Sequence, residues 1–265
     1  MKTIEWTPRV GVGQTACNNE RRRLLGLAWA AGAMALGLPA AARAQSWTAA
    51  GSSPFLWSNQ SPLGLYRSVN TMMLGRLSRT GPAGAQMPGA KPRAPLAATD
   101  FERTGGSVMP ARMAASGAPA QQAELRKTYE AILDAYLQLL KDSGELARLG
   151  SNVAGALTFL VTTAHYVHHG GTELSEAQQE LILGDFNDAL AQTPAFVQMS
   201  HRQRQELFET AGITGAYVLT MHRLGVEQRN PAHVKTAKEV ADLAVEQVFG
   251  VARSRLALEQ GVRVR

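Results

Sequence analysis

The stretch NVAGALTFLVTTAHYVHHGG, residues 152–171, predicts a helix together with both of its ends. Asn152 marks the start, because an asparagine side chain accepts a hydrogen bond from a free backbone N–H of the first turn. Gly170 and Gly171 mark the end, since glycine readily adopts the left-handed conformation that closes a helix. Apolar residues recur between these ends at the spacing of one helical face, namely Val153, Ala156, Leu157, Leu160, Val161 and Ala164.

Similar signals surround this stretch on both sides. Residues 121–142 carry an apolar stripe at helical spacing. Downstream, Ser175 and Ser200 are each followed three residues later by glutamine, which is the pattern of a capping box at a helix start. Asn230 followed by Pro231 predicts the start of a last helix, because proline suits the first helical position.

Glycines are expected to interrupt the later helices. Gly212 and Gly215 predict a kink or a break in the fourth helix, and Gly225 predicts its end. Residues 251–265 are expected to extend the last helix. Because no long segment alternates with the period of a strand, we predict an all-α domain at residues 120–265, folded as a single bundle of five or six helices.

The composition changes upstream of this bundle. Residues 79–119 hold six of the chain's 12 prolines and many glycines, which predicts a flexible linker. Within it, residues 99–101 and 108–113 are expected to lie along the domain surface. Residues 45–78 form an N-terminal segment, in which residues 62–78 predict a short amphipathic helix. This helix either docks onto the bundle or binds a partner, and docking is favoured because short isolated helices are marginally stable in water.

The first 44 residues have the three parts of a secretory signal peptide in the required order. Residues 21–23 are all arginine, residues 24–38 carry no charge, and small residues precede a cleavage site between Ala44 and Gln45. The apolar run is shorter than the roughly 20 residues of a spanning helix, so cleavage is favoured over a retained anchor. We therefore expect export to the periplasm or the exterior of a bacterium, by the general or the twin-arginine route.

Cleavage changes the charge and the cysteine content. The precursor has 27 Lys and Arg against 21 Asp and Glu, and residues 45–265 keep 21 against 19. Nucleic-acid binders need a basic face, so nucleic acid is not an expected partner. The single cysteine, Cys17, leaves with the signal, which excludes disulfides and thiolate metal sites. No later segment is apolar enough to span a membrane, so a soluble mature protein is expected.

Three histidines near the end of the 152–171 helix form the candidate metal site. His165 lies three and four residues before His168 and His169, so the rings can share one helix face and hold zinc or copper. Glu173 is a further possible ligand. The alternative is that the imidazoles only stabilise the negative C-terminal end of the helix, and helix geometry favours this second interpretation.

Two pairs of carboxylates are the candidates for acid–base chemistry. Asp185 with Asp188, and Glu206 with Glu209, lie three residues apart on their helices. Glycosidases use two carboxylates in a cleft, but a solvated helix face is the favoured interpretation of both pairs. The serine-hydrolase elbow and a phosphate-binding loop are both missing from the sequence.

Several short motifs together resemble an uncharacterised family of exported bacterial helical proteins, a domain of unknown function. The resemblance covers roughly residues 99–250. It is carried by Thr99-Asp100-Phe101, Asn152-Val153-Ala154, Tyr166 to Gly170, Ala195-Phe196 and Gln203 to Glu209. It implies export and a helical domain, and it brings no activity, cofactor or catalytic residue with it.

Three functions from different classes remain. The first is a non-enzymatic interaction protein that presents a surface or groove to an envelope protein, and it is favoured because catalytic motifs are missing while helix signals are well formed. The second is a bundle that binds metal or a small ligand through His165, His168 and His169. The third is an enzyme of unfamiliar type in the periplasm.

Overall fold

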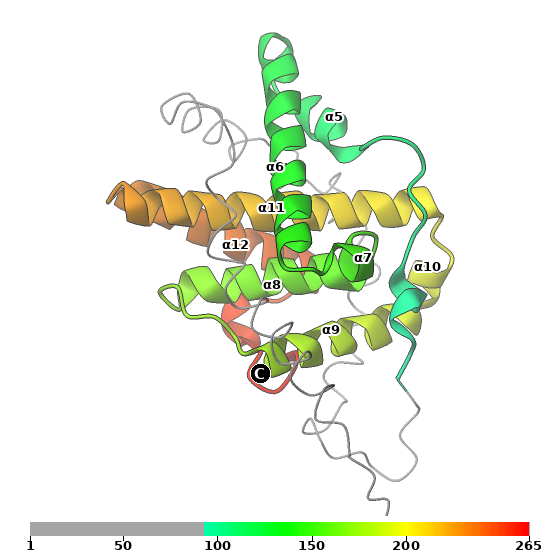
Figure 1. Ribbon diagram of the computed structural model, residues 1–265. Helices are drawn as coiled ribbons and strands as arrows, with labels where there is room; N and C mark the ends of the chain where they lie inside the picture. The colour runs from blue at the N-terminus through cyan, green and yellow to red at the C-terminus, as the bar shows by residue number, and fades with distance from the viewer. Residues whose placement is uncertain (1–92, 265) are drawn as a thin grey trace, which may run out of the picture.

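The computed structural model describes residues 93–264, and this part of the chain is all-α as predicted. The predicted signal peptide, the N-terminal segment with its 62–78 helix, and the linker up to residue 92 lie outside the described residues. Five helices are long, which confirms the expected number (Figure 1). They are α6 (Gln122–Asp142), α8 (Val153–His168), α9 (Glu176–Ala191), α11 (His201–Glu227) and α12 (Pro231–Phe249).

The remaining elements of the described chain are short. Three are single-turn or two-turn α-helices, namely α5 (Met109–Ala114), α7 (Leu146–Leu149) and α10 (Pro194–Val197). Three are 3₁₀ turns, namely η2 (Leu96–Thr99), η3 (Pro119–Gln121) and η4 (Arg253–Arg255). Strands β1 (Leu256–Ala257) and β2 (Arg263–Val264) pair antiparallel near the C-terminus.

Helix α8 occupies the centre of the molecule and begins as the sequence predicted. The side chain of Asn152 accepts a hydrogen bond from the backbone N–H of Gly155 at 2.8 Å. Thirteen of its sixteen residues are buried, because α9, α11 and α12 all pack against it. Both predicted capping boxes, at Ser175 and Ser200, also form and start α9 and α11.

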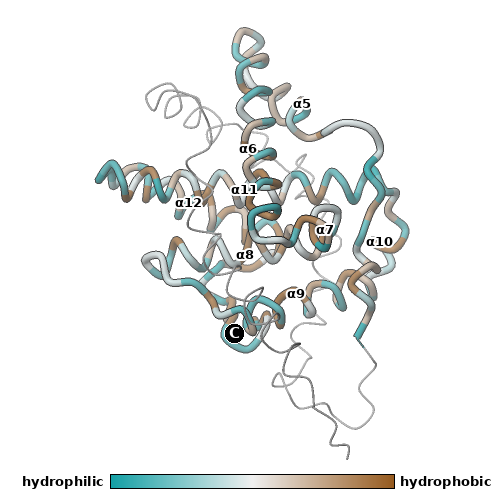
Figure 2. The backbone as a smooth tube through the Cα atoms, in the orientation of Figure 1, coloured by the Kyte–Doolittle hydropathy of each residue, from teal (hydrophilic) through white to brown (hydrophobic). Residues whose placement is uncertain are grey.

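The arrangement is less regular than an up-and-down bundle. Helix α6 runs steeply across α8 and α11 instead of lying beside them (Figure 1). Its N-terminal half packs against α5, and its buried face contacts α11. Figure 2 shows that hydrophilic residues gather where α11 ends and α12 begins, at the left of the view, where the helix pair extends beyond the others.

The predicted interruption of the fourth helix is wrong, because α11 runs unbroken for 27 residues through both glycines. A Cβ atom on Gly212 would overlap the ring of Tyr136, and one on Gly215 would lie 2.6 Å from a ring carbon of Phe159. The two glycines therefore let α6 and α8 approach the backbone of α11. Gly225 likewise lies inside the helix, where α12 comes close.

The predicted extension of the last helix is also wrong. Helix α12 ends at Gly250, which adopts the left-handed conformation (φ 66°). The following residues form η4 and the small hairpin instead. Val262 is fully buried, and its backbone N–H donates to Asp185 on α9 at 2.9 Å. This end of the chain is held in place because Leu258 and Val262 are buried in the hydrophobic core.

The structure also corrects the linker assignment for residues 93–119. Phe101 is only 4% exposed, and Met109 and Met113 are fully buried in the same core as the long helices. The described domain therefore begins near Arg93 and not at Ala120. Proline and glycine are tolerated here because the segment gains its order from tertiary contacts and not from helix propensity.

Candidate functional site

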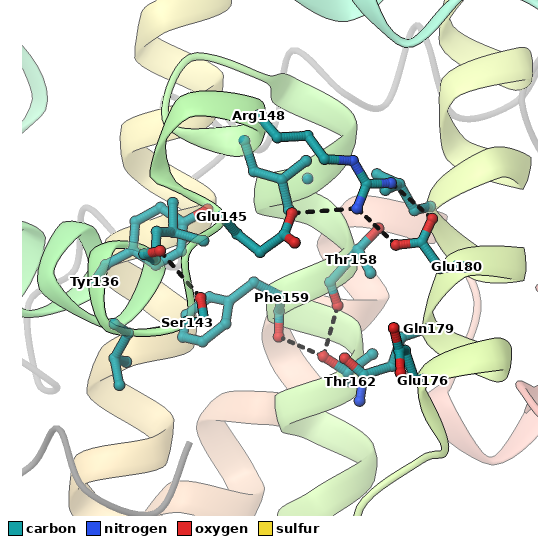
Figure 3. A pocket seen from close by; sticks show the side chains of 15 residues that line it. Tyr136, Ser143, Glu145, Arg148, Thr158, Phe159, Thr162, Glu176, Gln179 and Glu180 are labelled. Carbon is teal, nitrogen blue, oxygen red and sulfur yellow. Dashed lines mark hydrogen bonds and ion pairs between the residues drawn. The ribbon is translucent and has the colours of Figure 1, made fainter. Parts of the chain in front are cut away.

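An apolar pocket opens where α6 ends and α7 covers α8 and α9, and we call it the α7 pocket (Figure 3). Its cavity volume is about 60 Å³. Its wall is mainly hydrocarbon, formed by Tyr136, Leu139, Leu140, Leu149, Gly155, Phe159 and Leu183, with Thr158 and Thr162 among them. Its rim carries Ser143, Glu145, Arg148, Glu176, Gln179 and Glu180.

The polar groups inside the wall are already engaged or cannot ionise near neutral pH. Thr158 and Thr162 donate their hydroxyls to backbone carbonyls of α8 at 2.9 and 2.8 Å. Tyr136 packs against Phe159 with 4.7 Å between the ring centroids. Burial raises the pKa of Tyr136, and its hydroxyl has no hydrogen-bond partner within residues 93–264. The wall suits the binding of an apolar group and offers no acid or base.

One arginine ties the rim of the α7 pocket together. Arg148 on α7 donates two hydrogen bonds to Glu180 on α9, at 2.7 and 2.6 Å, and one to Glu145 at 3.1 Å. The hydrogen bonds to Glu180 raise the pKa of the guanidinium. Glu176 lies on the same rim. The rim thus carries three carboxylates and one cation, so the mouth of the pocket has a net negative charge.

The structure brings together only two of the three candidate metal ligands. The rings of His165 and His169 stack with centroids 3.8 Å apart and planes 12° from parallel. Nδ1 of His169 donates to the carbonyl of His165 at 3.0 Å, so this ring does cap the end of α8. His168 points elsewhere, with Nε2 2.9 Å from Oδ1 of Asp242 on α12.

These residues border a polar hollow that we call the histidine cavity. Its volume is about 320 Å³, and its lining is Val161, Ala164, His165, His168, His169, Val245, Arg253, Ser254, Leu256, Leu258 and Glu259. The carboxylate here is Glu259 and not the expected Glu173. Sequence reasoning missed Glu259 and Arg253 in this lining, and Asp242 beside His168. They lie more than 70 residues downstream, so only the fold places them near the histidines.

Both His165 and His168 are favoured as neutral rings. Burial lowers the pKa of His165, and the neighbouring His169 lowers it further. Burial also lowers the pKa of His168, with Arg253 as the next cause. A cation must lie in the plane of each ring that binds it, and two stacked rings share no such point. Within the described residues, no group of three His, Cys, Asp or Glu side chains is placed to hold a metal ion.

The pair Glu206 and Glu209 is not the solvated face that the sequence predicted. Glu209 is fully buried, and one of its oxygens accepts the backbone N–H groups of Val108 and Met109, each at 2.8 Å. Its other oxygen accepts from Gln205 at 2.7 Å. Glu206 is 8% exposed and forms an ion pair with Arg112 at 2.7 Å. Both carboxylates hold the segment around α5 onto α11.

The pair Asp185 and Asp188 has a similar structural role on α9. Asp188 accepts the backbone N–H of Ala94 at 2.8 Å, whereas Asp185 accepts that of Val262. Arg93 lies 3.7 and 3.8 Å from the two carboxylates. Burial raises the pKa of Asp185. The pair therefore fastens both ends of the described chain to one helix.

Residues 93–264 thus define an all-helical domain that carries the apolar α7 pocket and the polar histidine cavity, and its conspicuous carboxylates hold the fold together. The chain belongs to a family of unknown function (DUF6683), whose model matches residues 20–264. This confirms the resemblance to an uncharacterised helical family and extends it well upstream of residue 99. No curated protein and no solved structure matches the chain. None of the described helices is long and apolar enough to cross a membrane.

Proposed function

We propose that the protein is an exported, non-enzymatic binding protein that receives an apolar side chain of a partner in the α7 pocket. The observation that carries this proposal is the contrast between the hydrocarbon wall of the pocket and its acidic rim. A cavity of about 60 Å³ has room for a single side chain. Pockets for small-molecule ligands are usually about 300–1,000 Å³.

The chemistry of the pocket defines the kind of partner. A bulky apolar side chain would fill the cavity, and basic residues on either side of it would meet Glu145, Glu176 and Glu180. Burying an apolar side chain contributes about 1.5–3 kcal/mol to binding. The negative charges of the rim favour positively charged partners over negatively charged ones. Residues 1–44 support export, so the partner is expected in the bacterial envelope.

Filling the pocket tests this function. Thr158→Met places a longer side chain in the cavity, and Thr236→Met makes the same change on α12 away from it. The probe is a labelled lysine-rich peptide with one central phenylalanine, and fluorescence anisotropy measures its Kd. We expect Thr158→Met to weaken binding at least tenfold and Thr236→Met to leave it unchanged.

Export is tested separately. The protein should be isolated from the envelope fraction, with Gln45 as its first residue.

Equal binding by both variants would contradict the role of the pocket. A second control replaces the central phenylalanine of the peptide with alanine, which should abolish binding if the side chain enters the cavity. Raising the salt concentration should weaken binding of the peptide, because the charged residues of the rim are exposed to solvent and salt screens their attraction. A first residue upstream of Ala44 would contradict export by signal cleavage.

The histidine cavity is a second candidate, for a metal ion or a small polar ligand. Its size and its lining by His165, His169, Arg253 and Glu259 favour it. Zinc or copper would require one of the stacked rings to rotate. Calorimetric titration of the mature protein with zinc is the test: a site gives a Kd below millimolar that the double variant His165→Ala/His169→Ala removes. His233→Ala is the control, and an absence of heat with the unaltered protein ends this candidate.

A further inference from the structure

We propose that the occupant of the α7 pocket is a segment of the same chain, residues 61–78, with Met72 or Met73 as the side chain that enters. This inference rests on the proposed function of the pocket and names its partner. It assigns an intramolecular docking site to the surface formed by α6, α7, α8 and α9.

Charge is the first reason for this assignment. Residues 45–99 contain five basic residues and no acidic one, and the basic residues are Arg67, Arg76, Arg79, Lys91 and Arg93. From Asp100 to the end, the chain has 16 Lys and Arg against 19 Asp and Glu. The N-terminal segment is therefore uniformly positive and the domain slightly negative. The rim of the α7 pocket carries three carboxylates and one arginine, so it attracts a positively charged segment.

The apolar content of the segment is the second reason. The sequence SPLGLYRSVNTMMLGRLS, residues 61–78, predicts a helix whose apolar stripe has Met72 and Met73 near its middle. A helix of this length is marginally stable alone in water, so it needs a surface to cover its stripe. Methionine is unbranched and fills irregular cavities well. Its sulfur is also a weak acceptor, and the buried hydroxyl of Tyr136 has no partner within the described chain.

Reach is the third reason. Arg93 lies against α9, where its guanidinium packs on Gly184, the residue next to Leu183 of the pocket wall. The described chain thus starts on α9, one of the helices that form the pocket. Residues 79–92 connect the two parts, and fourteen residues span up to about 50 Å when extended. A tether of this length gives an effective concentration in the millimolar range, so even weak contacts suffice for docking.

The docking can be tested by disulfide cross-linking. Residues 45–265 contain no cysteine, so two introduced cysteines can pair only with each other. In the full mature chain, Gln179→Cys on the rim is paired with Met72→Cys, and mild oxidation should form an intramolecular disulfide. The matched control pairs Gln179→Cys with Thr71→Cys, which lies opposite the apolar stripe of the predicted helix. We expect the first pair to cross-link at least tenfold faster, measured by mass spectrometry of the linked peptides. Equal rates, or linkage only between two copies, would overturn the proposal.

A second measurement separates this inference from the function of the pocket itself. If residues 61–78 occupy the pocket, Met72→Asp/Met73→Asp should release them and tighten binding of the phenylalanine peptide about tenfold. Thr71→Asp/Ser78→Asp, on the polar face, adds the same charge as a control and should change the peptide affinity less than twofold. The docking proposal fails, while the binding function stands, under two conditions together. The peptide binds equally to the unaltered protein and to both double aspartate variants, and Thr158→Met still blocks its binding. If Thr158→Met has no effect on the peptide, the function itself fails.

Discussion

Replacing Glu209 with alanine is expected to lower the free energy of unfolding by about 3 kcal/mol or more. The carboxylate is fully buried and accepts three hydrogen bonds, two from the backbone at the start of α5 and one from Gln205. Without it, these donors remain buried and unpaired, and each such donor costs about 1–3 kcal/mol. Urea denaturation followed by circular dichroism at 222 nm measures the change.

The conservative variant Glu209→Gln identifies the cause of the loss. Glutamine keeps an oxygen for Val108 and Met109 but presents an NH₂ group to the NH₂ group of Gln205. We expect this variant to lower the free energy of unfolding by about 1–2 kcal/mol, which is less than the loss for Glu209→Ala. The control is Glu130→Ala, which breaks the exposed ion pair with Arg126 and should cost at most about 0.5 kcal/mol. A similar small loss for Glu209→Ala would show that the α5 segment does not depend on this carboxylate.

Gly212→Ala is expected to destabilise the protein by about 1–3 kcal/mol, although alanine favours helices. In an unobstructed helix the change gains about 1 kcal/mol. Here the new methyl group would overlap the ring of Tyr136, which is fully buried. That ring cannot move aside, because Phe159 and Phe208 pack against it at 4.7 and 5.5 Å between centroids. Overpacking of this kind costs about 1–3 kcal/mol and should exceed the helix gain.

Gly184→Ala on α9 is the matched control for this prediction. The atoms nearest to its new methyl group belong to the guanidinium of Arg93, a side chain that is 55% exposed and can move away. We therefore expect no loss, or a gain of up to about 1 kcal/mol. Urea denaturation of both variants gives the comparison. If Gly212→Ala stabilised the protein as much as Gly184→Ala, the glycine would not be needed for the approach of α6.

The two candidate sites differ in how far the sequence could predict them. The histidines of the histidine cavity lie within five residues, so the sequence pointed to them directly. Their orientation was not accessible, because whether His168 turns toward His165 or toward Asp242 depends on where α12 packs. The α7 pocket was not predicted at all. Its wall comes from four helices, and Leu183 or Thr158 alone has the pattern of an ordinary buried helix position.

What the sequence determined by itself was the set of helices and most of their ends. Asn152, Ser175 and Ser200 cap helices through hydrogen bonds to residues three positions away, so the information is local. Only the tertiary structure decided that α11 continues through Gly212, that Glu209 is buried, and that residues 93–119 belong to the domain. These outcomes depend on contacts between residues about 50 to 100 positions apart. Their energies arise from burial and from pairing of buried polar groups, which no local pattern records.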